Sequence, residues 1–301
     1  MKAPANSLHN KNSLFHKIIA TSPAFPYMAW TIVFIAIPLG LIVYFAFTDA
    51  SGAFTIENIA RAGEHMHVLF RSIKLAFIAT ALCVLISYPL AYIMSRKKAM
   101  TGQTLLMLCM LPMWMNFLLR TYAWMTILEN NGLINRFIMM LGFEPIRMIN
   151  TQGAVILGMV YNYLPFMVLP LYTTMSKIGN DVIEAAQDLG ANSVKVITKV
   201  VLPLSLPGIS SGVTMVFVPS VSTFIISKML GGGTNQLIGD IIDLQFLGNT
   251  YNPNLGSAIS LVLMVIVLLC MRIVGDTEDE TMGGRIRGKN TIFFPTSIPV
   301  S

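Results

Sequence analysis

Charged residues are scarce in this sequence. Asp, Glu, Lys and Arg together make up 11% of the 301 residues, whereas about a quarter of an average soluble domain is charged. Apolar residues make up 54% of the chain, which excludes an intrinsically disordered protein because disorder requires low hydrophobicity. The two values together indicate a membrane protein.

Cysteine and metal-ligand clusters are also scarce. Three cysteines in apolar stretches without C-x-x-C spacing exclude a disulfide scaffold. His65 and His67 have no third ligand nearby, so we expect no metal site. The G-x4-G-K-[ST] motif is absent from the sequence, so we expect no catalytic residue and no cofactor bound by this chain. The net charge of +6 lies in short clusters rather than along one face, and we therefore expect no nucleic-acid partner.

Six stretches of about 20 mainly apolar residues are long enough to cross a bilayer. They predict an all-α, polytopic membrane protein with spans at 27–47, 75–95, 104–124, 154–175, 208–227 and 251–271. Residues 27–275 form one predicted membrane domain, with tails at 1–26 and 276–301. Lys and Arg number thirteen on the side of the two tails and four on the other side. The positive-inside rule therefore predicts that both termini are cytoplasmic.

The connection at 176–207 is too long for a simple turn between two spans. Asp181 can cap a first short helix, with Glu184 three residues later, and Gly190 is suited to a left-handed C-terminal cap. A second short helix is predicted from Asn192 to Pro203. Two short helices on the cytoplasmic face would form a compact knob that fits the groove of a partner.

This connection matches the pattern E-A-A-x3-G-x9-I-x-L-P, with Val200 at the isoleucine position. The chain therefore resembles the permease subunits of ABC importers. The resemblance implies that the segment couples the permease to an ATPase. The coupling residues that it implies are Glu184, Ala185, Ala186, Asp188, Gly190, Leu202 and Pro203.

A wider resemblance covers roughly residues 25–275. The stretches 111–128, 131–135, 164–172, 230–233 and 237–239 are similar to spermidine/putrescine permeases of the PotB/PotH type. The resemblance implies the type I importer fold (MetI-like) in a bacterial inner membrane. It also implies three kinds of partner: a second related permease, two copies of a cytoplasmic ATPase that uses ATP, and an extracytoplasmic polyamine-binding protein.

Several polar and aromatic residues in the third, fourth and fifth spans are candidates for a substrate path. Aromatic rings and amide or hydroxyl groups can hold an ammonium weakly, although aromatic residues are also common at membrane interfaces. Arg120 can either snorkel or contact another helix, or line an outer gate. The candidates are Trp114, Asn116, Arg120, Tyr122, Trp124, Tyr161, Asn162, Tyr163, Ser220 and Thr223.

Lys228 is an unexpected charge for a polycation path, since it would repel the substrate. Asp240 and Asp243 follow in a loop without Lys or Arg and can restore a negative outer vestibule. Other functions stay open. They are import of another small solute such as iron, thiosulfate or a phosphonate, an ion-coupled secondary transporter, and an intramembrane enzyme, although the spans contain neither acidic residues nor a catalytic cluster.

Overall fold

The computed structural model describes residues 24–248 and 250–289, and within these ranges every named element is a helix. An isolated bridge between Thr48 and Phe54 is the sole extended pairing in the described part. The all-α prediction is therefore confirmed. Most of the two predicted tails, residues 1–23 and 290–301, lies outside the described residues.

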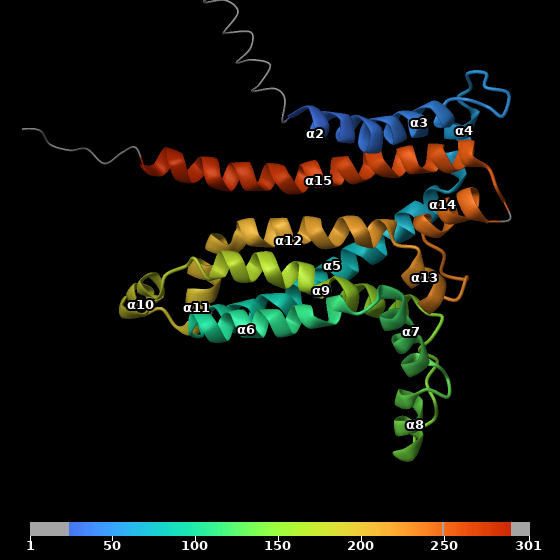
Figure 1. Cartoon of the computed structure of the whole chain (residues 1–301). Coiled ribbons are helices and arrows are strands. Elements are labelled where there is room, and N and C mark those ends of the chain that lie inside the picture. The colour runs from blue at the N-terminus through green and yellow to red at the C-terminus, as the bar shows by residue number, and fades with distance from the viewer. Residues whose placement is uncertain (1–23, 249, 290–301) are drawn as a thin grey trace, which may run out of the picture.

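The helices follow one another along the chain, joined by short loops (Figure 1). In chain order they are α2 (Ala24–Thr31), the π-helical turn η1 (Ile32–Ala36), α3 (Ile37–Ala46), α4 (Glu57–Glu64), α5 (Met66–Ser95), α6 (Ala99–Met110), the 3-10 turn η2 (Leu111–Trp114), α7 (Phe117–Leu128), α8 (Leu133–Met140), α9 (Gln152–Met175), α10 (Asn180–Asp188), α11 (Ser193–Val196), the π-helical turn η3 (Ile197–Val201), α12 (Leu202–Ser222), α13 (Ile225–Leu230), α14 (Ile238–Leu247) and α15 (Pro253–Lys289).

Five helices of the described chain are long and apolar enough to cross a membrane, and a bent pair of helices brings the number of spans to six. They are Pro26–Ala46, Met66–Ser95, Gln152–Met175, Ser193–Ser222 and Pro253–Arg272, together with the pair Ala99–Trp114 and Phe117–Met140. The predicted ends of the second and fourth spans at Ser95 and Met175 are confirmed. α5 begins nine residues before the predicted start, because its first turns carry Arg71 and Lys74 beyond the purely apolar stretch.

The third span is not the continuous helix predicted at 104–124. The helix axis turns by 87° between Trp114 and Phe117. Asn116 has extended backbone dihedrals, and its side-chain oxygen accepts hydrogen bonds from the backbone N–H groups of Leu118 at 2.8 Å and Leu119 at 3.4 Å. This N-cap starts a new helix in a new direction. The mainly apolar sequence on both sides of Asn116 gives no indication of the break.

The fifth span is also displaced from its prediction at 208–227. The helix begins at Ser193 and continues through η3 into α12, where it ends at Ser222. Thr223 is extended, and α13 then lies against α9. A Cβ at Gly158 of α9 would lie 2.5 Å from Leu230 and 2.8 Å from Ile226. Packing across this glycine therefore sets the position of α13.

The centre of the molecule is a layer of α5, α9 and α12, whose buried side chains form the main core. Small residues let α12 approach α9 closely, since a Cβ at Gly208 would lie 2.9 Å from the carbonyl oxygen of Pro170. A second core joins α3, α4, α14 and α15 to one end of α5 and α12. The first span is exposed along most of its length, apart from the buried Ala46 at its end, and lies beside α15 (Figure 1).

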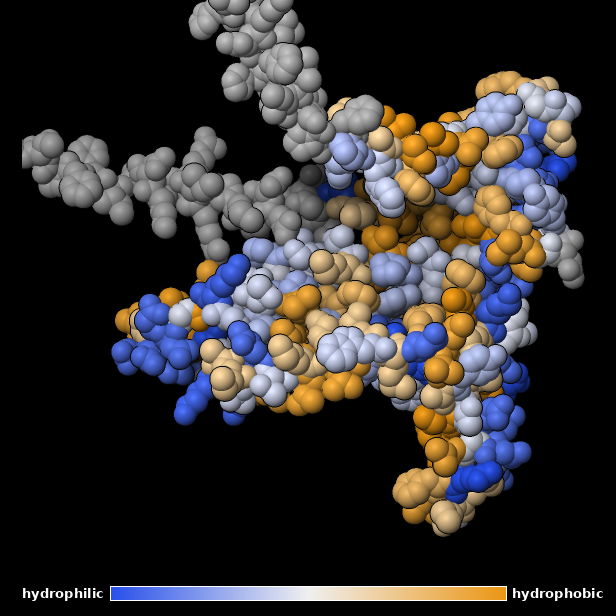
Figure 2. Space-filling model, viewed as in Figure 1, coloured by the Kyte–Doolittle hydropathy of each residue, from blue (hydrophilic) through white to orange (hydrophobic). Residues whose placement is uncertain are grey.

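The two ends of the bundle carry different short helices. α10 and α11 lie at one end, and α4, α8, α13 and α14 lie at the other (Figure 1). Hydrophilic residues gather at both ends, with mainly apolar residues over the spans between them (Figure 2). This distribution is the one expected of a chain that crosses a bilayer with its long helices roughly parallel to the membrane normal.

Candidate functional site

Residues 176–207, which carry the E-A-A pattern, form a compact helical knob at one end of the bundle, as predicted (Figure 1). α10 is followed by a turn in which Gly190 has φ +82°, so the predicted left-handed cap is confirmed. The predicted N-cap is wrong, because Gly179 precedes the first helical residue and Asp181 lies inside the first turn. An acidic residue there still interacts favourably with the positive end of the helix dipole.

The second short helix does not stop at Pro203, and this prediction is wrong. Asn192 caps α11 by accepting a hydrogen bond from the backbone N–H of Lys195 at 2.9 Å, as predicted. The helix then passes through η3 directly into α12. Pro203 lies inside this continuous helix, directly after the π-helical turn. A local π-helical adjustment of the hydrogen bonds is one way in which a membrane helix accommodates the missing N–H of proline. The knob is thus continuous with a membrane span.

A small apolar core holds the knob to the bundle. Ile178 and Ile183 are buried against Val196 and Val201, and Ala186 packs on this cluster. Glu184, Ala185 and Asp188 remain exposed on the other side of α10. The E-A-A residues therefore divide between an inward alanine, Ala186, and an outward pair.

The outward face of α10 is apolar as well as acidic. Val182, Ala185 and Leu189 are spaced at i, i+3 and i+7 and are exposed, with 90% of the Leu189 surface accessible. We call Val182, Glu184, Ala185, Asp188 and Leu189 the coupling surface. Sequence reasoning missed Val182 and Leu189, although their helical spacing was a signal. Leu202 and Pro203 lie apart from α10, in the first turn of α12.

Arg96, at the end of α5, joins three elements at the base of the knob. Its guanidinium donates to the carbonyl oxygens of Met175 at 2.6 Å and Ile178 at 3.1 Å, and to Oδ1 of Asn180 at 2.9 Å. A cation at the C-terminus of α9 also complements the helix dipole. The sequence identified Arg96 merely as one of three adjacent positive charges, so its role in fixing the start of α10 was missed.

The candidate path residues lie in two different settings. On the third span, Trp114 and Tyr122 are exposed, and they lie on opposite sides of the 87° bend. Trp124 packs edge-on against Tyr161 of α9 with ring centroids 5.3 Å apart. The three residues lie on the third span as predicted, but its bend separates Trp114 from Tyr122 and Trp124.

The fourth and fifth spans bring other candidates close together. Asn162 and Tyr163 are buried on α9, and the Tyr163 hydroxyl donates to the carbonyl oxygen of Pro219 at 3.4 Å. Ser220 and Thr223 are buried near the same end of α12. Within the described residues Oδ1 of Asn162 has no hydrogen-bond partner. A buried acceptor without a protein partner calls for a donor, which an ordered water or a bound group would supply.

Arg120 is buried rather than extended to the surface. Its side chain on α7 is 7% exposed, and Nε and Nη1 have no hydrogen-bond partner among the described residues. The guanidinium lies 5.9 Å from the centre of the Phe117 ring. This burial does not fit a snorkelling side chain, which would carry its charge to the interface.

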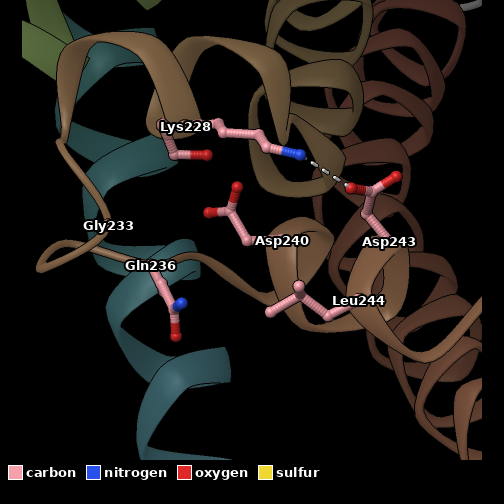
Figure 3. A pocket seen from close by; sticks show the side chains of 7 residues that line it. Lys228, Gly233, Gln236, Asp240, Asp243 and Leu244 are labelled. Carbon is pink, nitrogen blue, oxygen red and sulfur yellow. Dashed lines mark hydrogen bonds and ion pairs between the residues drawn. The ribbon is translucent and has the colours of Figure 1, made fainter. Parts of the chain in front are cut away.

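Lys228 does not stand alone at the opposite end of the bundle. Its Nζ lies 3.3 Å from Oδ2 of Asp243 (Figure 3). Asp240 lies on the same helix as Asp243 and accepts a hydrogen bond from the backbone N–H of Leu237 at 2.7 Å. Burial raises the pKa of Asp240 above its usual range. The sequence did not predict this ion pair, and Asp240 and Asp243 lie on the helix α14 rather than in the expected loop. The ion pair offsets the repulsion expected from Lys228.

Known proteins are similar to this chain over most of its length. The family model described as the binding-protein-dependent transport system inner membrane component matches residues 87–276. The spermidine/putrescine transport system permease protein PotB of Haemophilus influenzae is 38% identical over 251 residues, which cover 80% of this chain and 87% of the relative. PotB of Escherichia coli K12 is 34% identical over 256 residues, covering 82% and 93%.

A solved structure has the same fold. It is the crystal structure of a bacterial ABC transporter involved in the import of the acidic polysaccharide alginate. One of its chains superposes on this one with a TM-score of 0.71 at 16% sequence identity, covering 89% of this chain and 99% of that chain. The architecture is thus that of a type I importer permease, as predicted.

Proposed function

The chain belongs to the family of binding-protein-dependent transport system inner membrane components and resembles PotB over most of its length, and we propose that it is a permease subunit of an ATP-driven polyamine importer. The observation that carries the proposal is the identity of 34 to 38% with PotB over about four fifths of the chain. The exposed coupling surface supports the dependence on an ATPase.

Coupling takes place through α10. An ATPase that closes on ATP pulls on Glu184, Ala185 and Leu189, whose exposed positions favour docking in a groove. Because η3 and α12 continue from the knob without a break, and Arg96 ties α10 to α5 and α9, the motion reaches three spans at once. The spans then rock between inward-open and outward-open states, a population shift driven by the partner.

The partners follow from the same proposal. They are a second related permease, two copies of a cytoplasmic ATPase, and an extracytoplasmic protein that delivers the polyamine. The chain supplies half of the path and binds no cofactor, while the ATPase uses the ATP. The path candidates on this subunit are Trp114, Asn116, Arg120, Tyr122, Trp124, Tyr161, Asn162, Tyr163, Ser220 and Thr223. Asn162, with its free acceptor oxygen, is the best supported of them.

The cargo is tested with a panel of solutes. We expect spermidine or putrescine, loaded on the cognate binding protein, to stimulate ATP hydrolysis by the reconstituted importer. Thiosulfate, a phosphonate and ferric iron should have no effect. Stimulation by one of these solutes, with none by a polyamine, would show that the permease carries a different cargo.

The orientation is tested by labelling. We expect Gln187→Cys on α10 to react with a membrane-impermeant thiol reagent from the cytoplasmic side alone, and Glu144→Cys in the loop after α8 to react from outside. Both residues are exposed, and the three native cysteines are first replaced. The physical reason is the thirteen-to-four bias of Lys and Arg. Labelling of Gln187→Cys from outside would contradict the proposed orientation.

A further inference from the structure

A small cavity lined by several polar side chains lies between α13 and α14, at the end of the bundle opposite the coupling surface (Figure 3). Its volume is about 150 Å³. Polar side chains from both helices and the loop between them line it, with one leucine: Ser227, Lys228, Gln236, Asp240, Asp243 and Leu244. We call it the outer pocket.

An alkylammonium group already lies at the wall of the outer pocket. Lys228 extends toward Asp243, and its Nζ makes the ion pair at 3.3 Å (Figure 3). A lysine side chain is four methylene groups ending in an ammonium, which is an aminobutyl group. Putrescine is two such ends sharing one butyl chain, and spermidine carries one. The side chain of Lys228 is thus the same chemical group as the aminobutyl end of the proposed cargo.

The outer pocket contains two carboxylates, and the single ammonium of Lys228 neutralises one of them. Asp240 and Asp243 are three residues apart on α14 and therefore share one side of the helix. Asp240 is 7% exposed with its carboxylate directed into the pocket (Figure 3), while Lys228 pairs with Asp243. When both carboxylates are ionised, the three side chains carry a net charge of −1. Burial raises the pKa of Asp240, but an approaching cation favours its ionised form, so a cation is attracted even while Lys228 is in place.

We propose that the outer pocket is an entry site for the aminobutyl end of a polyamine, and that the ammonium of Lys228 competes with the substrate for Asp243. This proposal rests on the proposed function and adds a binding site to it. Lys228 can leave readily, because its side chain is 66% exposed and an exposed ion pair is weak. Asp243 is 17% exposed and stays in place as the acceptor.

The test is equilibrium binding of labelled spermidine to the complete permease–ATPase complex in nanodiscs, without the binding protein. A tethered competitor lowers the apparent affinity of the site. Lys228→Met should therefore bind spermidine about two- to five-fold more tightly than the unmodified complex. Asp243→Asn and Asp240→Asn should bind it more weakly. The matched control is Arg61→Met, which breaks the exposed Arg61–Glu57 ion pair on α4 and should leave binding unchanged.

A second variant shows whether a change in affinity comes from the lost ammonium or from misfolding. Lys228→Cys is assembled first and then modified with an aminoethyl thiosulfonate, which rebuilds an ammonium on a chain of similar length. Modification should return the affinity to that of the unmodified complex, whereas a methyl thiosulfonate should not. Unchanged or weaker binding in Lys228→Met, or no effect of the rebuilt ammonium, would overturn the entry site. Failure of the unmodified importer to take up any polyamine in vesicles would instead reject the proposed function.

Discussion

A permease that carries Glu184→Lys or Gly190→Val should insert into the membrane and lose ATP-driven uptake by about tenfold or more. Glu184 is exposed on the coupling surface, so reversing its charge acts on the docked ATPase and not on the core. Gly190 has φ +82°, a conformation that a β-branched residue adopts only with strain. Uptake and ATP hydrolysis by reconstituted vesicles are measured together.

Matched controls separate coupling from folding. Gly142 has φ +84° with open space around its Cα and lies in the loop after α8. Gly142→Val introduces the same backbone strain far from α10 and should leave uptake within about twofold. Glu144→Lys reverses an exposed charge in that same loop and should also be tolerated. If the α10 variants kept full uptake and substrate-stimulated hydrolysis, the coupling surface would be wrongly assigned.

Removing the guanidinium of Arg96 should uncouple the transporter. Arg96→Ala breaks bonds to the carbonyl oxygens of Met175 and Ile178 and to the side chain of Asn180. Hydrogen bonds of charged groups contribute roughly 1.5–3 kcal/mol each, so losing them should shift the position of α10 and lower transport by about tenfold or more. We expect fewer substrate molecules to be transported per ATP hydrolysed.

The neighbouring lysines provide the control for Arg96. Lys97→Ala and Lys98→Ala remove the same charge from the same loop, and both side chains are exposed. They should change neither the orientation of the permease nor its coupling. Equal losses in all three variants would mean that positive charge in this loop matters, and that the bonds made by Arg96 do not.

The features that the sequence predicted correctly depend on local chemistry. A glycine directly after a short helix indicates a left-handed C-terminal cap, and the structure gives Gly190 the expected positive φ. Ser95 and Met175 end their helices where apolar runs meet polar residues. The E-A-A spacing located the knob. Val182 and Leu189 on its outer face were missed, although their helical spacing is also a local signal.

The features that were missed depend on contacts between distant parts of the chain. The hydropathy of residues 104–124 gives no sign of the break at Asn116, whose side chain caps a helix in a new direction. Arg96 differs from Lys97 only through acceptors some 80 residues further on. Lys228 seemed to oppose a cationic cargo until the structure paired it with Asp243. Such pairings are set by tertiary packing, which one sequence does not reveal.

The central claim is that ATP hydrolysis at the α10 end drives import by this permease. The most direct measurement is accumulation of labelled spermidine by vesicles that contain the complete importer, loaded binding protein outside and ATP inside. We predict accumulation that requires ATP and that Glu184→Lys abolishes. Accumulation driven by an ion gradient without ATP, and unaffected by Glu184→Lys, would contradict the account and indicate a secondary transporter.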